Sequence, residues 1–186
     1  MSAVSEPVLQ SLVEAAVTGT GGADGWLLTP RGDQLEVVAA SGPSAADILG
    51  ALVAADAGTA GFVLGSGQPM ALTPRADDPR TATGVTEIIG RRPTSVLCIP
   101  CESDLGVVGV LEIIDKAEGA MFSFDDVELA TLLAGVAGVA IQTRDASSRT
   151  APAPDELAGE LRRLAGADPG RYAIVAGLVA ALVTDG

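Results

Sequence analysis

Two cysteines have a spacing that could support redox or metal chemistry. Cys98 and Cys101 form a Cys-x-x-Cys pair inside an apolar run that begins at Ser95, and such pairs serve in thiol exchange or as half of a zinc site. The run is typical of a β-strand, in which residues three apart point to opposite faces and their Cα atoms lie about 10 Å apart. A disulfide requires less than about 7 Å. We therefore predict two buried structural thiols, with thiol-based redox chemistry as the alternative.

The sequence contains no histidine. This excludes a Ser-His-Asp triad, a His-ligated haem and a two-histidine metal site. No further cysteine can complete a metal site with the Cys-x-x-Cys pair, so we expect neither a metal nor a haem cofactor. The acidic pairs Asp77–Asp78 and Asp125–Asp126 have no visible catalytic partner and are interpreted as turn and helix-cap residues.

The net charge of −13 excludes two classes of partner. It arises from 24 acidic and 11 basic residues, and Lys116 is the single lysine. Phosphate backbones and anionic membrane surfaces would both be repelled, so we expect no nucleic acid and no membrane. Arg80, Arg91 and Arg92 could hold an anionic ligand, although a solvated surface is the simpler interpretation. The N-terminus lacks signal-peptide features, and the apolar segment 173–183 is shorter than the about 20 residues that span a bilayer, so we expect a cytoplasmic protein.

The central feature of the chain is a pair of apolar runs, 95–101 and 105–116, joined by the polar turn 102–104. Runs of Val, Ile and Leu around such a turn predict an antiparallel hairpin. A second hairpin is predicted between Trp26 and Ala40, and the tripeptide Arg31-Gly32-Asp33 is interpreted as part of its turn. Apolar residues at helical spacing predict helices over 5–18, 45–54, 58–66 and 123–145.

The order of several short motifs resembles the GAF domain family. Gly58, Gly61, the triplet Gly67-Gln68-Pro69 and the triplet Asp78-Pro79-Arg80 precede the hairpin, and Phe122 with a Ser-x-x-Asp cap follows it. The resemblance covers residues 7 to 146. It implies an α+β fold with a GAF/PAS-like antiparallel sheet of five or six strands. The first helix and the long helix after Ser123 would share one face, and a small-molecule pocket would lie between the other face and residues 45–92.

The candidate site residues fall into two groups. Those expected to line the pocket are Phe62, Thr73, Arg80, Leu97, Ile99, Cys101 and Glu112. The second group, Asp115, Lys116, Phe122 and Asp126, resembles the signature of cyclic-nucleotide-binding GAF domains. Asp115 replaces the Asn of that signature and Val127 replaces its Glu, so we predict no cyclic nucleotide binding. A Lys116–Asp126 ion pair that ties a strand end to a helix start is the simpler interpretation.

The GAF resemblance implies a sensor or regulatory module without enzymatic activity. Two alternatives stay open: a free methionine sulfoxide reductase on a GAF fold, which needs a reactive thiol, and a ligand-free adaptor. No output domain follows on the chain, so we expect any signal to pass through dimerisation or through a partner protein, and we expect a homodimer. Two apolar stripes, Leu9-Leu12-Val13-Ala16 and Ala130-Ala134-Ala137-Ile141, are predicted to pair two molecules in a helical bundle.

Composition divides the chain into a GAF-like domain over 1–146, a linker over 147–154 and a pair of helices over 155–186. The two tail helices carry the stripes Leu157-Leu161-Leu164 and Ile174-Leu178-Leu182. Helices of this length are marginal alone in water, so their stripes must be buried against something. We expect residues 155–186 to dock on a partner protein, and packing within the dimer is the alternative.

Overall fold

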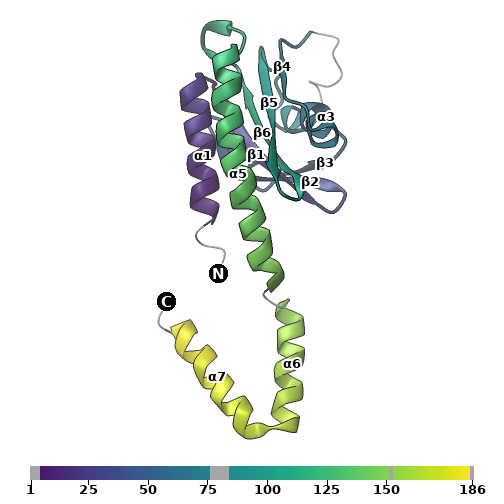
Figure 1. Ribbon diagram of the computed structural model, residues 1–186, viewed down its shortest axis with the longest axis vertical. Helices are drawn as coiled ribbons and strands as arrows, with labels where there is room; N and C mark the ends of the chain where they lie inside the picture. The colour runs from purple at the N-terminus through teal and green to yellow at the C-terminus, as the bar shows by residue number, and fades with distance from the viewer. Residues whose placement is uncertain (1–4, 76–83, 151–152, 185–186) are drawn as a thin grey trace. The chain divides into compact units, whose positions relative to one another are not determined.

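The computed structural model describes residues 5–75, 84–150 and 153–184 (Figure 1). The chain divides into two compact units, Met1–Asp145 and Ala146–Gly186. The elements of the first are α1 (Ser5–Thr20), β1 (Asp24–Arg31), β2 (Gln34–Ser41), α2 (Ala45–Ile48), β3 (Leu52–Ala54), α3 (Gly58–Ser66), β4 (Met70–Leu72), α4 (Val85–Ile88), β5 (Val96–Ser103), β6 (Gly106–Ile114) and most of α5 (Phe124–Thr150). The second unit contains α6 (Pro154–Ala167) and α7 (Pro169–Thr184).

Six antiparallel strands form one sheet in the order β3-β2-β1-β6-β5-β4. This confirms the predicted α+β fold and both predicted hairpins. The central strands β1, β5 and β6 are buried along most of their length because helices cover both faces of the sheet. Burial on both faces explains why the sequences of these strands are continuous apolar runs and do not alternate between apolar and polar residues.

α1 and α5 lie side by side on one face of the sheet, as predicted (Figure 1). The core beneath them, called here the helix-face core, joins Leu9 and Val13 of α1 to Ile141 of α5 and to Leu97 and Leu111 of the sheet. All five side chains are at least 98% buried, so the two helices are held to the sheet by apolar contact.

The small side chains of α5 face the sheet of the same molecule. Ala130, Ala134 and Ala137 are buried in the helix-face core, and a Cβ on Gly138 would lie 2.0 Å from the carbonyl oxygen of Glu102. The prediction that the alanine stripe pairs with a second molecule is therefore wrong. Small side chains let the helix approach the sheet closely, and the larger apolar side chains are left facing outward.

The opposite face of the sheet carries α2, α3 and α4. Their core, called here the pocket-face core, includes Trp26, Cys98, Val110 and Ile114 from the sheet. The helix predicted over 45–54 is wrong in its second half, because α2 ends at Ile48 and β3 follows. Gly50 adopts a φ of 80°, which reverses the chain and lets Leu52–Ala54 pair with β2. Gly67 ends α3 in the left-handed conformation, as predicted.

A reciprocal cap begins α5. The Ser123 backbone N–H and hydroxyl donate to Asp126 Oδ2 at 2.6 and 2.9 Å, and the Asp126 N–H donates to Ser123 Oγ at 3.3 Å. This confirms the predicted cap. The helix then continues to Thr150, which corrects the linker predicted over 147–154: no proline or glycine interrupts residues 146–150, and Pro154 opens α6.

α6 and α7 contact one another within the second unit. Asp168 caps α7 by accepting a hydrogen bond from the Arg171 N–H at 3.0 Å, as its position before Pro169 predicted. Leu157 and Ile174 are exposed, whereas the Leu178 and Leu182 side chains lie outside the described residues. Docking of this unit on a partner stays a prediction. Among the described helices, none combines the length and apolarity required to cross a bilayer.

We predict that Gly138→Ala lowers the free energy of unfolding by about 1–3 kcal/mol, because the new methyl group must push α5 away from Glu102. The matched control is Gly65→Ala in α3, where nothing lies within 4 Å of the added Cβ. The control should be neutral or slightly stabilising. Urea unfolding of both variants tests this, and equal stabilities would contradict the close contact.

Candidate functional site

A buried carboxylate lies at the centre of the pocket face. Glu112 projects from β6, two residues before the strand ends, and is only 3% exposed. Its Oε2 accepts a hydrogen bond from Trp26 Nε1 at 2.8 Å, and its Oε1 accepts one from Thr59 Oγ1. Because Trp26 belongs to β1 and Thr59 to the first turn of α3, the carboxylate ties three elements together.

Burial raises the pKa of Glu112, and the hydrogen bonds from Thr59 and Trp26 only partly oppose this effect. Cys98 lies directly opposite Glu112 in the β5–β6 register. Burial and the neighbouring Glu112 carboxylate raise the pKa of the Cys98 thiol well above its ordinary value. Both groups are therefore biased toward their neutral forms.

A small cavity lies beside the Glu112 carboxylate. Its volume is about 10 Å³, which is room for about one water molecule. The residues that line it are Val53, Ala57, Gly58, Thr59, Ala60, Gly84, Val85 and Glu112. Several belong to the first turn of α3, where backbone N–H groups have no acceptor within the helix. The cavity is therefore polar, and in this conformation it admits a water-sized group.

Of the predicted pocket residues that the structure describes, only Glu112 lines this cavity. Phe62 and Thr73 are exposed, and Arg80, like Asp77–Asp78, lies outside the described residues. Trp26, Thr59 and the Gly84–Val85 pair were missed by the sequence analysis. An acidic residue inside an otherwise apolar strand was the signal that could have led to them.

Three predicted pocket residues lie on the opposite face of the sheet. Leu97, Ile99 and Cys101 are buried in the helix-face core under α1 and α5. Their assignment to the pocket is therefore corrected. Successive side chains of a strand alternate between faces, so the face that takes Cys98 cannot take these three residues.

The cysteines lie on opposite faces of the sheet, as their spacing predicted. Cys98 is in the pocket-face core and Cys101 is in the helix-face core, and both are fully buried. Burial raises the pKa of Cys101 to about 12. Since the thiolate is the nucleophilic form, neither sulfur is activated in this fold.

The nucleotide-signature residues serve the junction between β6 and α5. Lys116 pairs with Asp126 and lies 5.8 Å from the centroid of the Phe122 ring. Burial works to raise the pKa of Asp126, but Lys116 and the Ser123 donors outweigh it and lower that pKa. The predicted ion pair is confirmed, and it ties the end of β6 to the start of α5.

Arg91 joins two carboxylates instead of facing a pocket. Its guanidinium pairs with Asp24 at 2.5 Å and with Asp115. Asp24 also accepts a hydrogen bond from the Ser44 N–H at 2.7 Å, and Asp115 accepts one from the Thr94 N–H at 2.6 Å. The suggested role of Arg91 in holding an anionic ligand is therefore corrected, because its charge is used to fix the segment after α4 against β1 and β6.

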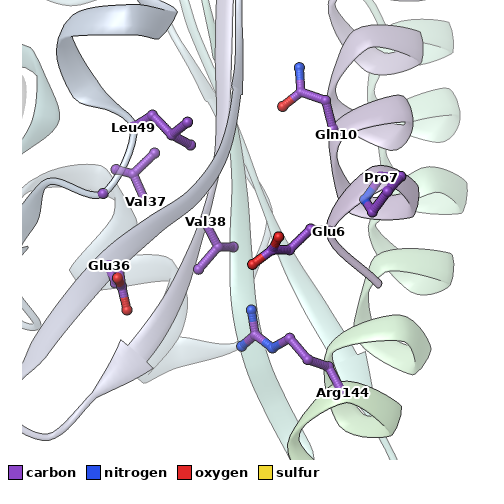
Figure 2. A pocket seen from close by; sticks show the side chains of 9 residues that line it. Glu6, Pro7, Gln10, Glu36, Val37, Val38, Leu49 and Arg144 are labelled. Atoms are coloured by element: carbon purple, nitrogen blue, oxygen red, sulfur yellow. The ribbon is translucent and has the colours of Figure 1, made fainter. Parts of the chain in front are cut away.

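A larger groove lies between α1, β2 and α5 (Figure 2). Its volume is about 610 Å³. The lining residues are Glu6, Pro7, Gln10, Glu36, Val37, Val38, Leu49, Gly50 and Arg144. The groove combines charged groups of both signs with apolar surface. Across the part of the chain that the structure describes, no group of three or more His, Cys, Asp or Glu side chains could hold a metal ion.

A family model described as "GAF domain" matches residues 5–142. The chain belongs to the GAF domain family. GAF domains are generally sensor or regulatory modules, and the architecture above is theirs: the resemblance predicted from the motif order is confirmed.

Several solved structures are similar to this GAF domain. The GAF-B domain of DevS from Mycobacterium smegmatis is 20% identical, with a TM-score of 0.61 over 79% of this chain and 99% of that chain. The GAF domain of a phosphoenolpyruvate-protein phosphotransferase from Coxiella burnetii is 18% identical, with a TM-score of 0.68 over 78% and 86%. A type II free methionine-R-sulfoxide reductase from Thermoplasma acidophilum is 12% identical, with a TM-score of 0.62 over 76% and 95%. At these identities the likeness shows the fold alone.

We predict that Glu112→Gln makes the protein less sensitive to alkaline pH. The folded-state pKa of Glu112 is raised above its ordinary value of 4.5, so its contribution to stability is present below pH 4.5 and is lost as pH rises through the folded pKa. Glutamine can still accept a hydrogen bond from Trp26, and its amide N–H can donate to the Thr59 hydroxyl oxygen in place of the bond that Thr59 donates to Glu112, but glutamine cannot ionise. The variant should gain on the order of 1 kcal/mol or more over the native protein between pH 4.5 and pH 8.

Urea unfolding across this pH range measures the difference, in which the contributions of all other groups cancel. Glu128→Gln, an exposed acid on α5, is the control and should follow the native curve. A Glu112→Gln variant whose disadvantage grows as the pH rises would show that the carboxylate is stabilised as an ion, contrary to the argument from burial.

Proposed function

We propose that this GAF protein is a non-enzymatic regulatory module that acts as a homodimer through the outer face of α5. The observation that carries the proposal is the composition of that face. Between Glu128 and Arg144 its exposed residues are Thr131, Leu132, Gly135, Val136, Val139 and Thr143. None is charged, and Leu132, Val136 and Val139 are 71, 53 and 60% exposed.

Charge favours a second copy of the chain as the occupant of this face. Two molecules that each carry a net charge of −13 repel one another when their acidic surfaces meet. The electrostatic repulsion is smallest when the two molecules meet through an uncharged helix face. Gly135 has open space around it, which leaves a hollow between Leu132 and Val139 for a side chain of the other molecule. Antiparallel α1 and α5 from two molecules would then form a four-helix arrangement.

We predict that Leu132→Glu produces a monomer. Two carboxylates would be buried in the pairing of the two α5 helices without a cationic partner, which is strongly unfavourable. Leu105→Glu is the matched control, because Leu105 is 64% exposed in the β5–β6 turn and lies outside the proposed interface. Light scattering coupled to gel filtration at about 100 μM, some hundredfold above a micromolar dissociation constant, measures the masses.

The native protein and Leu105→Glu should run as dimers and Leu132→Glu as a monomer. A monomeric native protein at this concentration would refute the homodimer. Equal masses for the two variants would exclude this face as the interface.

The burial of both thiols supports the non-enzymatic assignment over the alternative of a methionine sulfoxide reductase. A thiol catalyst needs an accessible sulfur that can become a thiolate. Cys98 and Cys101 are fully buried, and burial raises the pKa of both. The similarity to the Thermoplasma reductase extends to the fold only.

We predict that neither cysteine reacts with iodoacetamide at pH 8 in the folded protein within an hour, and that both react in urea. Intact-mass spectrometry counts the added groups. Rapid labelling of Cys98 or Cys101 before unfolding, or turnover of free methionine sulfoxide with a thiol reductant, would favour the reductase instead.

The Glu112 cavity is the place for a sensed small molecule within this proposal. A ligand larger than water must displace the first turn of α3 or α4, which would transmit binding to the sheet through Thr59 and Trp26. The small volume of the cavity supports the ligand-free adaptor as the second candidate. Native mass spectrometry of the purified protein separates the two, because a retained ligand adds mass to the dimer.

A further inference from the structure

The two helices that border the Glu112 cavity differ in how firmly they are held. On one side is the first turn of α3, where Thr59 donates a hydrogen bond to the Glu112 carboxylate and the helix packs on β5 and β6. On the other side are Gly84 and Val85, at the start of the four-residue helix α4. α4 packs chiefly against α2, which is also four residues long. Opening the cavity therefore requires less disruption at α4 than at α3.

A glycine with a positive φ lies on each side of α4. Gly84 has a φ of 72° and a ψ of −139°, and Gly90 has a φ of 66°. Such positions can absorb the backbone rotations that accompany the movement of a short element. Nothing lies within 4 Å of a Cβ added to Gly90, so neighbouring atoms leave room for it to turn. α4 is therefore a short segment between two hinges.

Arg91 directly follows the second hinge and ties α4 to the sheet. Its guanidinium pairs with Asp24 at 2.5 Å and with Asp115. Asp24 is the first residue of β1, Asp115 follows the last residue of β6, and these two strands are neighbours in the sheet. The planar fork of an arginine suits it to bridge two carboxylates. Arg91 thus fixes one end of α4 to two central strands at once.

The two carboxylates that hold Arg91 are fixed by the rest of the fold. Asp24 is fully buried and accepts a hydrogen bond from the Ser44 N–H at 2.7 Å, and Asp115 accepts one from the Thr94 N–H at 2.6 Å. A buried carboxylate that loses its cationic partner is unfavourable, so the paired arrangement is the stable one. The Arg91 side chain is 43% exposed, so water can replace its partners without unfolding of the sheet.

We propose that Arg91 is a latch that keeps the Glu112 cavity closed, and that the cavity opens to a ligand when the two ion pairs of Arg91 break. α4 then turns about Gly84 and Gly90, and the wall formed by Gly84 and Val85 moves away from Glu112. This movement enlarges a space that otherwise admits only a water-sized group. The inference rests on the proposal that the Glu112 cavity receives the sensed molecule.

Trp26 reports on access to the cavity in the full chain. It is the single tryptophan, it is fully buried, and it donates a hydrogen bond to Glu112. Quenching of its fluorescence by acrylamide, a neutral amide larger than water, measures that access. Arg91→Gln should raise the quenching constant by about threefold or more, because local opening becomes more frequent. Asp115→Asn should raise it less, since the pair with Asp24 remains and asparagine tolerates the φ of 56° at this position.

Arg31→Gln is the matched control, because it breaks an exposed ion pair with Glu36 outside the cavity. It should be quenched as the native protein is. Hydrogen exchange measured by mass spectrometry locates the opening: in Arg91→Gln it should become faster in residues 84–92 and in the first turn of α3, while α1 and α5 keep their native rates.

Native quenching in a folded Arg91→Gln variant would overturn the latch, and so would exchange that becomes faster throughout the first unit. Circular dichroism melting verifies the fold of each variant. Should Arg91→Gln not fold, Asp115→Asn decides, and native quenching in that variant would overturn the latch. Native mass spectrometry tests the ligand separately. A protein whose quenching responds as expected but that retains no ligand would support the latch and count against sensing at this cavity.

Discussion

Burial of the central strands on both faces is the constraint on which this GAF domain depends. The buried residues of β5 and β6 face either the helix-face core or the pocket-face core, because α1 and α5 cover one side of the sheet and α2 to α4 cover the other. A shift of one residue in register would exchange the two sets of side chains. It would place Glu112 under α5, where the alanines of that helix leave no room for it. The position of Glu112 on the pocket face therefore depends on how α5 packs on the opposite face of the sheet.

The same constraint explains the chemistry of the interior. A carboxylate confined between strands has no solvent, so it needs donors, and β1 and α3 supply them through Trp26 and Thr59. The thiols have no such partners and remain neutral, one on each face. The interior therefore contains a polar junction but no activated nucleophile among its cysteines.

Charges at the ends of the central strands β1 and β6 hold the neighbouring loops. Arg91 bridges Asp24 and Asp115, and Lys116 bridges to Asp126, so two of the few basic residues are committed to positioning the connections around β6. Through these ion pairs, Asp24, Asp115 and Asp126 of a strongly negative chain stabilise the fold. The outer face of α5 lies apart from this network and has no charge, which distinguishes it from the rest of an acidic surface.

The sequence by itself determined the family, the antiparallel hairpins, the caps at Ser123 and Gly67, and the opposite orientation of Cys98 and Cys101. These features depend on local periodicity, on turn chemistry and on the order of short motifs, and each of these is determined by residues that are close together in the sequence. Tertiary structure alone decided which face each stripe takes. The sequence shows that Ala130, Ala134 and Ala137 share one side of a helix, but only packing shows that the sheet requires small side chains there and leaves Leu132 outside. The sequence likewise shows that Glu112 is an acid in an apolar strand. Its partners Thr59 and Trp26 lie 53 and 86 residues away in the chain, and only folding brings them within hydrogen-bonding distance.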